Sequence, residues 1–288
     1  MSIRRACLPT GWYPRDASSV RRAVEAWKPR PSGMGSKAAI APHAGWTFSG
    51  RIASIAWSAL GEAETVAIVG GHLPSSSPIL FAPENGFESP FGTIAADLEL
   101  RDRLLDLLAG LSLPTAGDRA PDNTVEVHLP FMGLFAAGAR VLWLRAPASG
   151  AAIELGKAIH EAASSLGRKV VVLGSTDLTH YGPDYGFEPK GRGSAAERWV
   201  REVNDRKFLD ALIALDPTSA ISFAVEEGSA CSPGAAAAAL AFALAEGAGT
   251  FAELAYGTSL DVRPASSFVG YAALASSRDP LTGGPESR

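Results

Sequence analysis

The chain has 288 residues, of which 47% are hydrophobic and 19% charged, so it can bury the core of one large domain or of two smaller ones. Its 26 basic and 30 acidic residues are spread along the sequence and leave a net charge of −4, which gives no electrostatic reason to expect nucleic acid or an anionic membrane as a partner. The sequence has no run of about 18 apolar residues and no apolar segment behind its basic start, which favours a cytoplasmic protein.

Helical and strand periodicities alternate along the chain. In chain order, the expected elements are a strand at 39–41, a helix capped by Ser49 and ending near Leu60, strands at 65–70, 79–82 and 92–96, a helix starting at Asp97, a helix starting at Asn123, a strand at 140–144, a helix at 150–166, a strand at 169–173, two or three helices within 194–246, and strands at 251–256 and 268–274. Glu126 lies three residues after Asn123, as in a capping box, and Pro130 must then lie in a first turn or kink the helix.

No internal repeat occurs, and no segment is rich enough in proline, glycine or serine to separate two domains. The alternation predicts a single α/β domain over residues 1–278, with a central, largely parallel or mixed sheet flanked by helices. The last residues, 279–288, are predicted to form a disordered tail.

Polar motifs directly follow three of the β-branched, apolar runs. His43 follows the first run, His72 the second, and the segment from Ser175 to His180, which includes Asp177, follows the third. In open α/β sheets, ligands bind beyond the carboxyl ends of parallel strands. The placement therefore predicts a metal or catalytic site at one edge of the sheet. The alternative is that each polar group only caps its own strand.

The two cysteines, Cys7 and Cys231, lie far apart in the sequence and form at most one bridge. Free thiols in a reducing compartment are the better expectation. Cys231 is then available as a ligand, whereas Cys7 is expected to be a lone thiol near the terminus.

Several motifs in this order resemble those of the Memo family, also called AmmeMemoRadiSam system protein B. The matching segments are GWYPRD (11–16), APHAGWTFSG (41–50), VGGHLPSS (69–76), FESPFGTIAADLEL (87–100), DNTVEVHLPF (122–131), GSTDLTHYGPDYGF (174–187), ACSPGAAAAAL (230–240), YGTSLDV and SSFVGYAAL. The resemblance implies a fold similar to that of the class III extradiol dioxygenases, with a metal pocket at the strand ends.

The resemblance also implies roles for individual residues. His43, His72 and Cys231 match a metal-binding set, and Asp177 and His180 match residues that line the same pocket, with His180 as an acid or base. One position departs from the family, which usually has histidine where this chain has Asn123. An asparagine can donate and accept hydrogen bonds, but it cannot shuttle a proton or ligate strongly.

Two imidazoles and an anionic third ligand leave open positions on a metal ion. A carboxylate in third place, such as Asp177, would favour Fe(II), whereas the thiolate of Cys231 is softer and suits copper, zinc or thiolate-tolerant iron. Fe(II) or copper is the expected ion, with zinc as the alternative. The predicted function is a metal-dependent, dioxygenase-like oxidoreductase acting on a small molecule such as a phenol. A non-catalytic metal- or peptide-binding protein of signalling type and a zinc-dependent hydrolase are the other hypotheses.

The remaining candidates have simpler interpretations. His128 is expected to be a buried hydrogen-bonding residue, Glu126 a helix cap, and His160 a residue at the surface or boundary. The segment 182–194, with Lys190 and Arg192, either closes over the pocket and brings positive charge to a substrate or is a surface loop. Aromatic residues flank the histidine motifs and form either a pocket wall or core: Trp46, Phe48, Tyr181, Tyr185 and Phe187.

Overall fold

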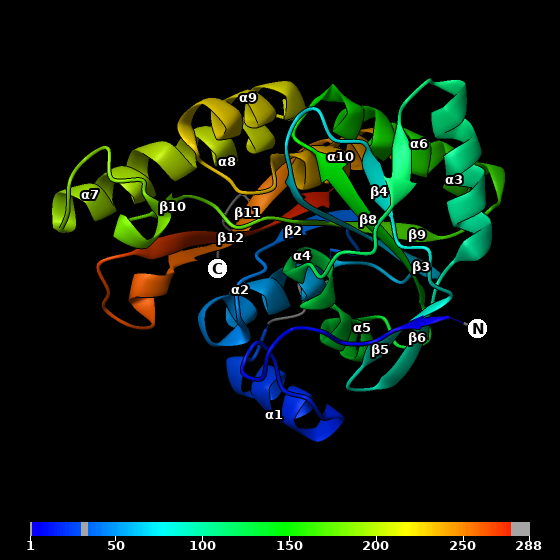
Figure 1. The fold of residues 1–288 in the computed structure, drawn as a ribbon, viewed down its shortest axis with the longest axis horizontal. Helices are drawn as coiled ribbons and strands as arrows, with labels where there is room; N and C mark the ends of the chain where they lie inside the picture. The colour runs from blue at the N-terminus through cyan, green and yellow to red at the C-terminus, as the bar shows by residue number, and fades with distance from the viewer. Residues whose placement is uncertain (1, 30–33, 278–288) are drawn as a thin grey trace, which may run out of the picture.

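A central β-sheet with helices on both faces organises the protein, for which a computed structural model describes residues 2–29 and 34–277 (Figure 1). Across the sheet, the strands are, in order, β10 (His180–Tyr181), β12 (Phe268–Ser277), β2 (Ala38–Ala41), β9 (Val170–Ser175), β3 (Thr65–Leu73), β8 (Arg140–Pro147), β4 (Ile79–Phe81) and β7 (Thr115–Gly117), with β11 (Thr250–Thr258) paired to β12. Strands β2, β9, β3 and β8 run parallel, and β12 is antiparallel to β2. The expected α/β fold with a mixed central sheet is confirmed. The predicted tail, 279–288, lies outside the described residues.

The central strands are buried on both faces because nearly every side chain is apolar. Successive residues of β2 alternate between two hydrophobic clusters: Ala38 and Ile40 pack into one, and Ala39 and Ala41 into the other. The same alternation runs through β3 and β9. Burial on both faces explains why these strands appear in the sequence as continuous apolar runs without a polar face.

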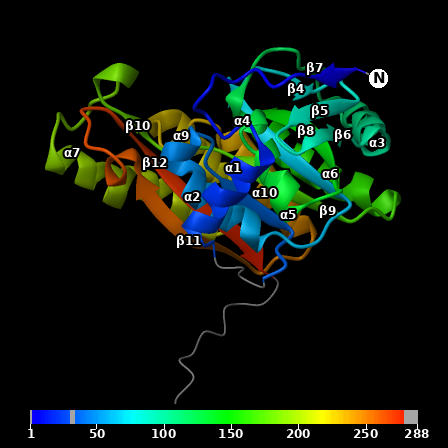
Figure 2. The same cartoon turned by 90° about the horizontal axis from the view of Figure 1, so that it is seen from below.

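Two layers of helices cover the faces of the sheet. One face packs against α3 (Leu98–Gly110), α6 (Gly150–Ser165), α8 (Asp205–Ile213), α9 (Pro217–Glu227) and α10 (Pro233–Ala245). The other packs against α1 (Ala17–Trp27), α2 (Trp46–Ala59) and α5 (Leu129–Phe135). Figure 2 shows α1 and α2 lying across this second face. The remaining helical segments are α4 (Asn123–Glu126), η1 (Pro183–Tyr185), α7 (Ser194–Trp199), the π-helical turn η2 (Val200–Asn204) and η3 (Ser259–Asp261).

The alanine-rich helix α10 lies unusually close to the sheet. Its residues from Pro233 to Ala243 are buried, and Gly174 of β9 faces its backbone. A Cβ atom built on Gly174 would lie 2.6 Å from the carbonyl oxygen of Ala235. Small side chains on both surfaces therefore set the distance between α10 and the site-bearing strands.

Some predicted boundaries are wrong for identifiable reasons. Helix α2 begins at Trp46, and its N-cap, Gly45, lies four residues before the predicted cap. Ser49 lies inside the helix, where its hydroxyl donates to the carbonyl oxygen of Ala44. A small sheet, with strand order β1 (Ile3–Arg4), β5 (Gly86–Ser89), β6 (Gly92–Ala95), includes two strands that the sequence did not indicate, β1 and β5. These strands are short and lie in turn-rich sequence, so their periodicity is weak.

Within the described residues, no helix has both the length and the apolar character needed to cross a bilayer.

Replacing Gly174 with alanine should lower the free energy of unfolding by about 1–3 kcal/mol, because the added methyl group would force α10 away from β9. Gly117→Ala is the matched control, since a Cβ atom there has no neighbour within 4 Å. Urea unfolding of both variants measures the effect. Equal stability of the two variants would contradict the close packing of α10.

Candidate metal centre

The register of three parallel strands brings the polar motifs together. Ala41 at the end of β2 pairs with Ser175 of β9, and Val69 of β3 pairs with Gly174 of β9. The carboxyl ends of the three strands therefore lie side by side. His43 follows β2 by two residues. His72 lies near the end of β3, where the pairing with β8 is irregular between Gly70 and Leu73. The predicted convergence of the motifs at one edge of the sheet is thus found.

Close packing around β3 directs His72 into the site. His72 has a φ of 57°, a left-handed conformation that is rare for a residue with a side chain and that clusters at functional sites. The two glycines before it admit neighbours that a side chain would exclude. A Cβ on Gly71 would lie 2.3 Å from the Cβ of Ser232, and one on Gly70 would lie even closer to Oγ1 of Thr124. The hydroxyl of Ser232 accepts a hydrogen bond from the His72 amide at 3.1 Å.

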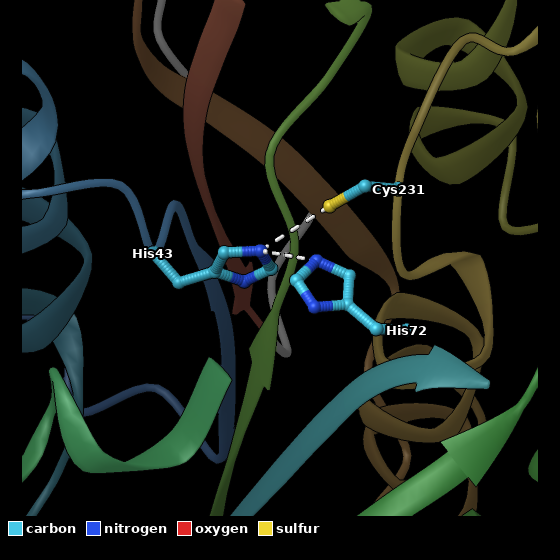
Figure 3. A group of neighbouring side chains, drawn as sticks. All are labelled: His43, His72 and Cys231. Carbon is cyan, nitrogen blue, oxygen red and sulfur yellow. Dashed lines mark hydrogen bonds between the residues drawn. The ribbon is translucent and has the colours of Figure 1, made fainter. Parts of the chain in front are cut away.

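His43, His72 and Cys231 point toward one another (Figure 3). The Nε2 atoms of the two histidines lie 3.2 Å apart, and the Sγ atom of Cys231 lies 3.2 Å from Nε2 of His43. One ligand atom from each residue lies within 4.8 Å of the other two. Around a tetrahedral ion with ordinary metal–nitrogen and metal–sulfur bonds, ligand atoms are separated by roughly 3.3 to 3.6 Å. These three residues therefore fit a single metal ion.

The three groups shift one another's pKa values. Burial disfavours the charged form of His43, but the neighbouring Cys231 and Asp177 outweigh it and raise the His43 pKa. Burial likewise opposes ionisation of Cys231, but His43 and His72 hold its pKa well below the ordinary value. The thiolate is the form of cysteine that ligates metals. The surroundings therefore favour the ligating form of Cys231.

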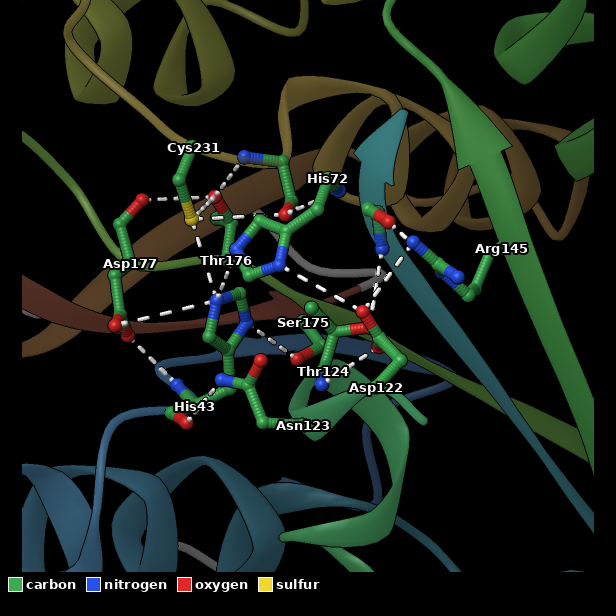
Figure 4. A network of polar contacts seen from close by, with 12 residues as sticks. His43, His72, Asp122, Asn123, Thr124, Arg145, Ser175, Thr176, Asp177 and Cys231 are labelled. Carbon is green, nitrogen blue, oxygen red and sulfur yellow. Dashed lines mark hydrogen bonds and ion pairs between the residues drawn. The ribbon is translucent and has the colours of Figure 1, made fainter. Parts of the chain in front are cut away.

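A second layer of polar groups supports His72 (Figure 4). The carboxylate of Asp122 lies 3.7 Å from Nδ1 of His72 and 3.3 Å from the guanidinium of Arg145, whose Nε donates to the carbonyl oxygen of Gly71 at 2.9 Å. Although partial burial opposes it, Asp122 together with Cys231 raises the His72 pKa to about 10. Asp122 and Arg145 thus fix both the ring of His72 and the backbone before it.

Asp177 and His180 lie beside this cluster, as predicted. Asp177 accepts a hydrogen bond from the His43 amide at 2.7 Å, and its other oxygen lies 4.0 Å from Nε2 of His43 and 3.8 Å from Nε2 of His180. Burial acts against the charge on His180, but Asp177 and Cys231 raise its pKa. Nε2 of His180 is buried and has no hydrogen-bond partner among the described residues. The polar contact that this nitrogen makes is the ion pair with Asp177.

Asn123 faces the site and does not cap a helix. Asp122 is the N-cap of α4, because its side chain accepts from the amide of Thr124 at 2.8 Å. The Nδ2 atom of Asn123 donates to the carbonyl oxygen of His43 at 3.2 Å. The predicted capping box is therefore wrong. Its other member, Glu126, is buried and accepts hydrogen bonds from the N-terminal segment.

The other two histidines occupy structural positions, as expected. His128 is fully buried, and burial together with the nearby His43 lowers its pKa to about 3. Its ring lies between Trp57 and Ser175. His160 is half-buried on α6 and pairs with Glu246 at 2.8 Å.

A cavity of about 400 Å³ opens beside the cluster. Of the flanking aromatic residues, Phe48 and Tyr185 line it, whereas Trp46 and Tyr181 are buried in the core. The residues that line it, besides these two aromatics, include His43, His72, Asn123, Asp177, His180, Trp12, Asp184, Ser259, Arg263, Ser267 and Tyr271.

The positive charge at this cavity comes from a residue that the sequence did not single out. Arg263 lines the cavity, with its guanidinium 5.6 Å from the ring of Phe48. Lys190 instead lies over Trp199, and Arg192 pairs with Glu188. Of the two interpretations of segment 182–194, the one that brings Lys190 and Arg192 to the pocket does not describe this structure. No motif marks Arg263, because it lies in a loop far along the chain from the histidine motifs.

The buried carboxylate of Asp205 holds the loop that carries Asp177 and His180. Asp205, at the end of the π-helical turn, accepts hydrogen bonds from the amide and hydroxyl of Thr179 and from the hydroxyl of Tyr256. Burial raises the Asp205 pKa to about 6. Thr179 lies between the two site residues, so Asp205 holds the loop in place.

Fold and site together define an α/β protein with a His, His, Cys group, able to hold a metal ion, at the carboxyl edge of its sheet. Sequence comparison agrees with this class: residues 4–275 match the family described as Memo-like protein. A MEMO1 family protein of Pyrococcus furiosus is 32% identical, with 94% of this chain and 98% of that protein covered. One of Methanothermobacter thermautotrophicus is 30% identical over 94% of this chain and 99% of its own length. The chain therefore belongs to the Memo-like family.

Among solved structures, an uncharacterized protein, JW3007, of Escherichia coli K12 aligns with a TM-score of 0.49 and 12% identity, covering 76% of this chain and 88% of that one. A similarity of this size has no bearing on activity.

The contribution of Asp205 to stability should depend on pH. Its folded pKa of about 6 is above the ordinary value of 3.8, so the stability that it contributes is present below pH 3.8 and is lost as the pH rises through 6. Relative to wild type, Asp205→Asn should therefore become more stable by up to roughly 3 kcal/mol between pH 4 and pH 7.5. Urea unfolding at both pH values tests this, with exposed Asp106→Asn as the control. A difference that does not change with pH would contradict it.

Replacing Asn123 with histidine should change metal binding more than stability. No helix cap is lost, because Asp122 provides it, and an imidazole at this position would face the cavity as an additional ligand or base. Cobalt titration and thermal melting of Asn123→His measure the two effects, with Asn123→Ala as the control for loss of the amide. A lower melting temperature with unchanged cobalt affinity would show that Asn123 has only a structural role.

Proposed function

We propose that this protein is a metal-dependent oxidoreductase of dioxygenase-like type that acts on a small molecule. The observation that carries the proposal is the adjacency of two groups. His43 and His72, two members of the candidate ligand set completed by Cys231, line a cavity that is also lined by His180, whose Nε2 lies 3.8 Å from Asp177. Ligands on one side and a proton-transfer group on the other are what such a reaction requires.

The ligand set would hold a redox-active ion, Fe(II) or copper. Such an ion supplies electron transfer and an open coordination position for a substrate oxygen atom. Three protein ligands would leave room for a substrate atom on the ion, and two of them, His43 and His72, line the cavity. The thiolate of Cys231 would lower the positive charge of the ion.

The chain's own residues would handle the substrate proton. In its neutral form, Nε2 of His180 would accept a proton from a hydroxyl group of the substrate. Asp177, 3.8 Å away, stabilises the resulting imidazolium. Nδ2 of Asn123 is occupied by the carbonyl oxygen of His43, so its Oδ1 atom is left to accept a hydrogen bond from a ligand. Both groups therefore favour a small molecule that carries hydroxyl or amino groups.

Arg263 and the aromatic residues favour a planar, anionic molecule. Phe48 and Tyr185 offer apolar faces, and the guanidinium of Arg263 offers the positive charge for a carboxylate or phenolate. The cavity volume of about 400 Å³ suits a small molecule. We expect such a reaction to take place in the cytoplasm, where both free cysteines, Cys7 and Cys231, would stay reduced.

Zinc-dependent hydrolysis is the second candidate. The observation that favours it is the thiolate of Cys231, because two histidines and one cysteine are an established catalytic zinc set. In that case His180 would act as the general base for water.

Metal analysis with dioxygen uptake separates the two. Protein purified without added metal should contain iron or copper, and Cys231→Ala and His43→Ala should each reduce the metal content to near zero. With a panel of small phenols, the iron-loaded wild type should consume dioxygen, and His180→Ala should lose this activity by at least 100-fold while keeping its metal, since proton transfer typically contributes roughly 10²- to 10⁴-fold. Zinc as the bound metal, with ester hydrolysis and no dioxygen uptake, would replace the first candidate with the second. A metal-binding protein without turnover would overturn both.

A further inference from the structure

The hydroxyl group of Ser175 links His43 to buried side chains that the proposed reaction does not use. Its Oγ atom lies 2.9 Å from Nδ1 of His43 and 3.0 Å from Nε2 of His128. Nδ1 of His128 lies 3.2 Å from Nε1 of Trp57. All four side chains are buried. Figure 4 shows Ser175 on the side of the His43 ring away from Cys231.

The direction of these hydrogen bonds follows from the chemistry of Trp57. An indole N–H only donates, so Nδ1 of His128 must accept and cannot carry a proton. The one ring proton of His128 is therefore on Nε2, which donates to Ser175. The serine oxygen keeps a second lone pair for Nδ1 of His43.

That second lone pair matters if His43 binds a metal ion. A metal ion on Nε2 takes the lone pair of that atom, so the ring proton of His43 must be on Nδ1. The oxygen of Ser175 is the acceptor at 2.9 Å from this nitrogen. Without the Ser175 oxygen, the buried Nδ1–H group of His43 would have no acceptor, which would disfavour the tautomer that binds the ion through Nε2.

We propose that Ser175, held in place by His128 and Trp57, is a positioning residue that keeps the proton of His43 on Nδ1 and so leaves Nε2 free to bind a metal ion. This inference rests on the proposed metal site. It also distinguishes the two histidines, because Nδ1 of His72 faces the carboxylate of Asp122 at 3.7 Å. One imidazole is thus oriented by a neutral hydroxyl and the other by a charged group.

Cobalt binding to three proteins tests the proposal. Titration with Co²⁺, followed by the thiolate-to-cobalt absorption that requires Cys231, should give a dissociation constant at least tenfold weaker for Ser175→Ala than for wild type, since outer hydrogen-bond partners are typically worth roughly 10- to 100-fold in metal affinity. Ser54→Ala is the matched control: Ser54 is equally buried, but its hydroxyl donates to the carbonyl oxygen of Arg51 in α2. Its affinity should equal that of wild type.

A second measurement separates positioning from general loss of structure. In zinc-loaded wild type, NMR should show a slowly exchanging Nδ1–H proton on His43. Trp57→Phe, which removes the indole N–H donor together with part of the buried ring, should shift that resonance and weaken Co²⁺ binding to a smaller extent than Ser175→Ala. Equal Co²⁺ affinity of wild type and Ser175→Ala would overturn the inference while leaving the metal site intact. A His43 proton on Nε2 would overturn both the inference and the assignment of this nitrogen as a ligand atom. If wild type itself binds neither ion, the proposed metal site fails, and the inference fails with it.

Discussion

The parallel pairing of β2, β9 and β3 is the constraint on which the site depends. Parallel neighbouring strands end at the same edge of a sheet, so the residues that directly follow them lie close together at that edge. His43 and His72 lie on the outer two of these strands, and Ser175 lies between them on β9. A register shift of one residue would turn Ser175 to the opposite face of the sheet.

The third candidate ligand reaches the site from outside the sheet. Cys231 lies in the connection between α9 and α10, and its amide donates to the carbonyl oxygen of Asp177 at 3.1 Å. The next amide, of Ser232, donates to the hydroxyl of Thr176. Docking of α10 against Gly174 and these two hydrogen bonds place the sulfur beside the imidazoles. The position of the Cys231 sulfur therefore depends on how α10 packs against the sheet.

The sequence predicts the fold and the convergence of the motifs well, because both follow from the order of apolar runs. The placement of Asp177 and His180 after β9 follows from the same principle. Residues whose positions depend on tertiary packing are not predictable in this way. Asn123 and Asp122 are both good helix caps, and only the packing of α4 against β3 decides which one caps. Glu126 has the spacing of a capping box, but the N-terminal segment supplies stronger donors.

Ser175 and Arg263 illustrate the same limit. A serine at a strand end has no distinctive spacing, and its partners, His128 and Trp57, are 47 and 118 residues away. Arg263 comes from a loop before β12, whereas Lys190 and Arg192, closer in sequence to His180, point elsewhere. Local sequence determines strands and helix starts, whereas contacts across the sheet edge determine which polar side chains face the cavity.

The carboxylate of Glu126 connects the N-terminal segment to the helix beside the candidate site. It is buried at the end of α4 and accepts hydrogen bonds from the amides of Cys7 and Leu8 and from the hydroxyl of Tyr13, at 2.8 to 3.0 Å. A short deletion or a bulky fusion at this end would leave a buried negative charge without its donors, in the same four-residue helix that begins beside His72 and His43. For recombinant work, truncations that remove the segment around Cys7 and Leu8 are therefore changes to the support of the candidate metal site, even though they are made near one end of the sequence.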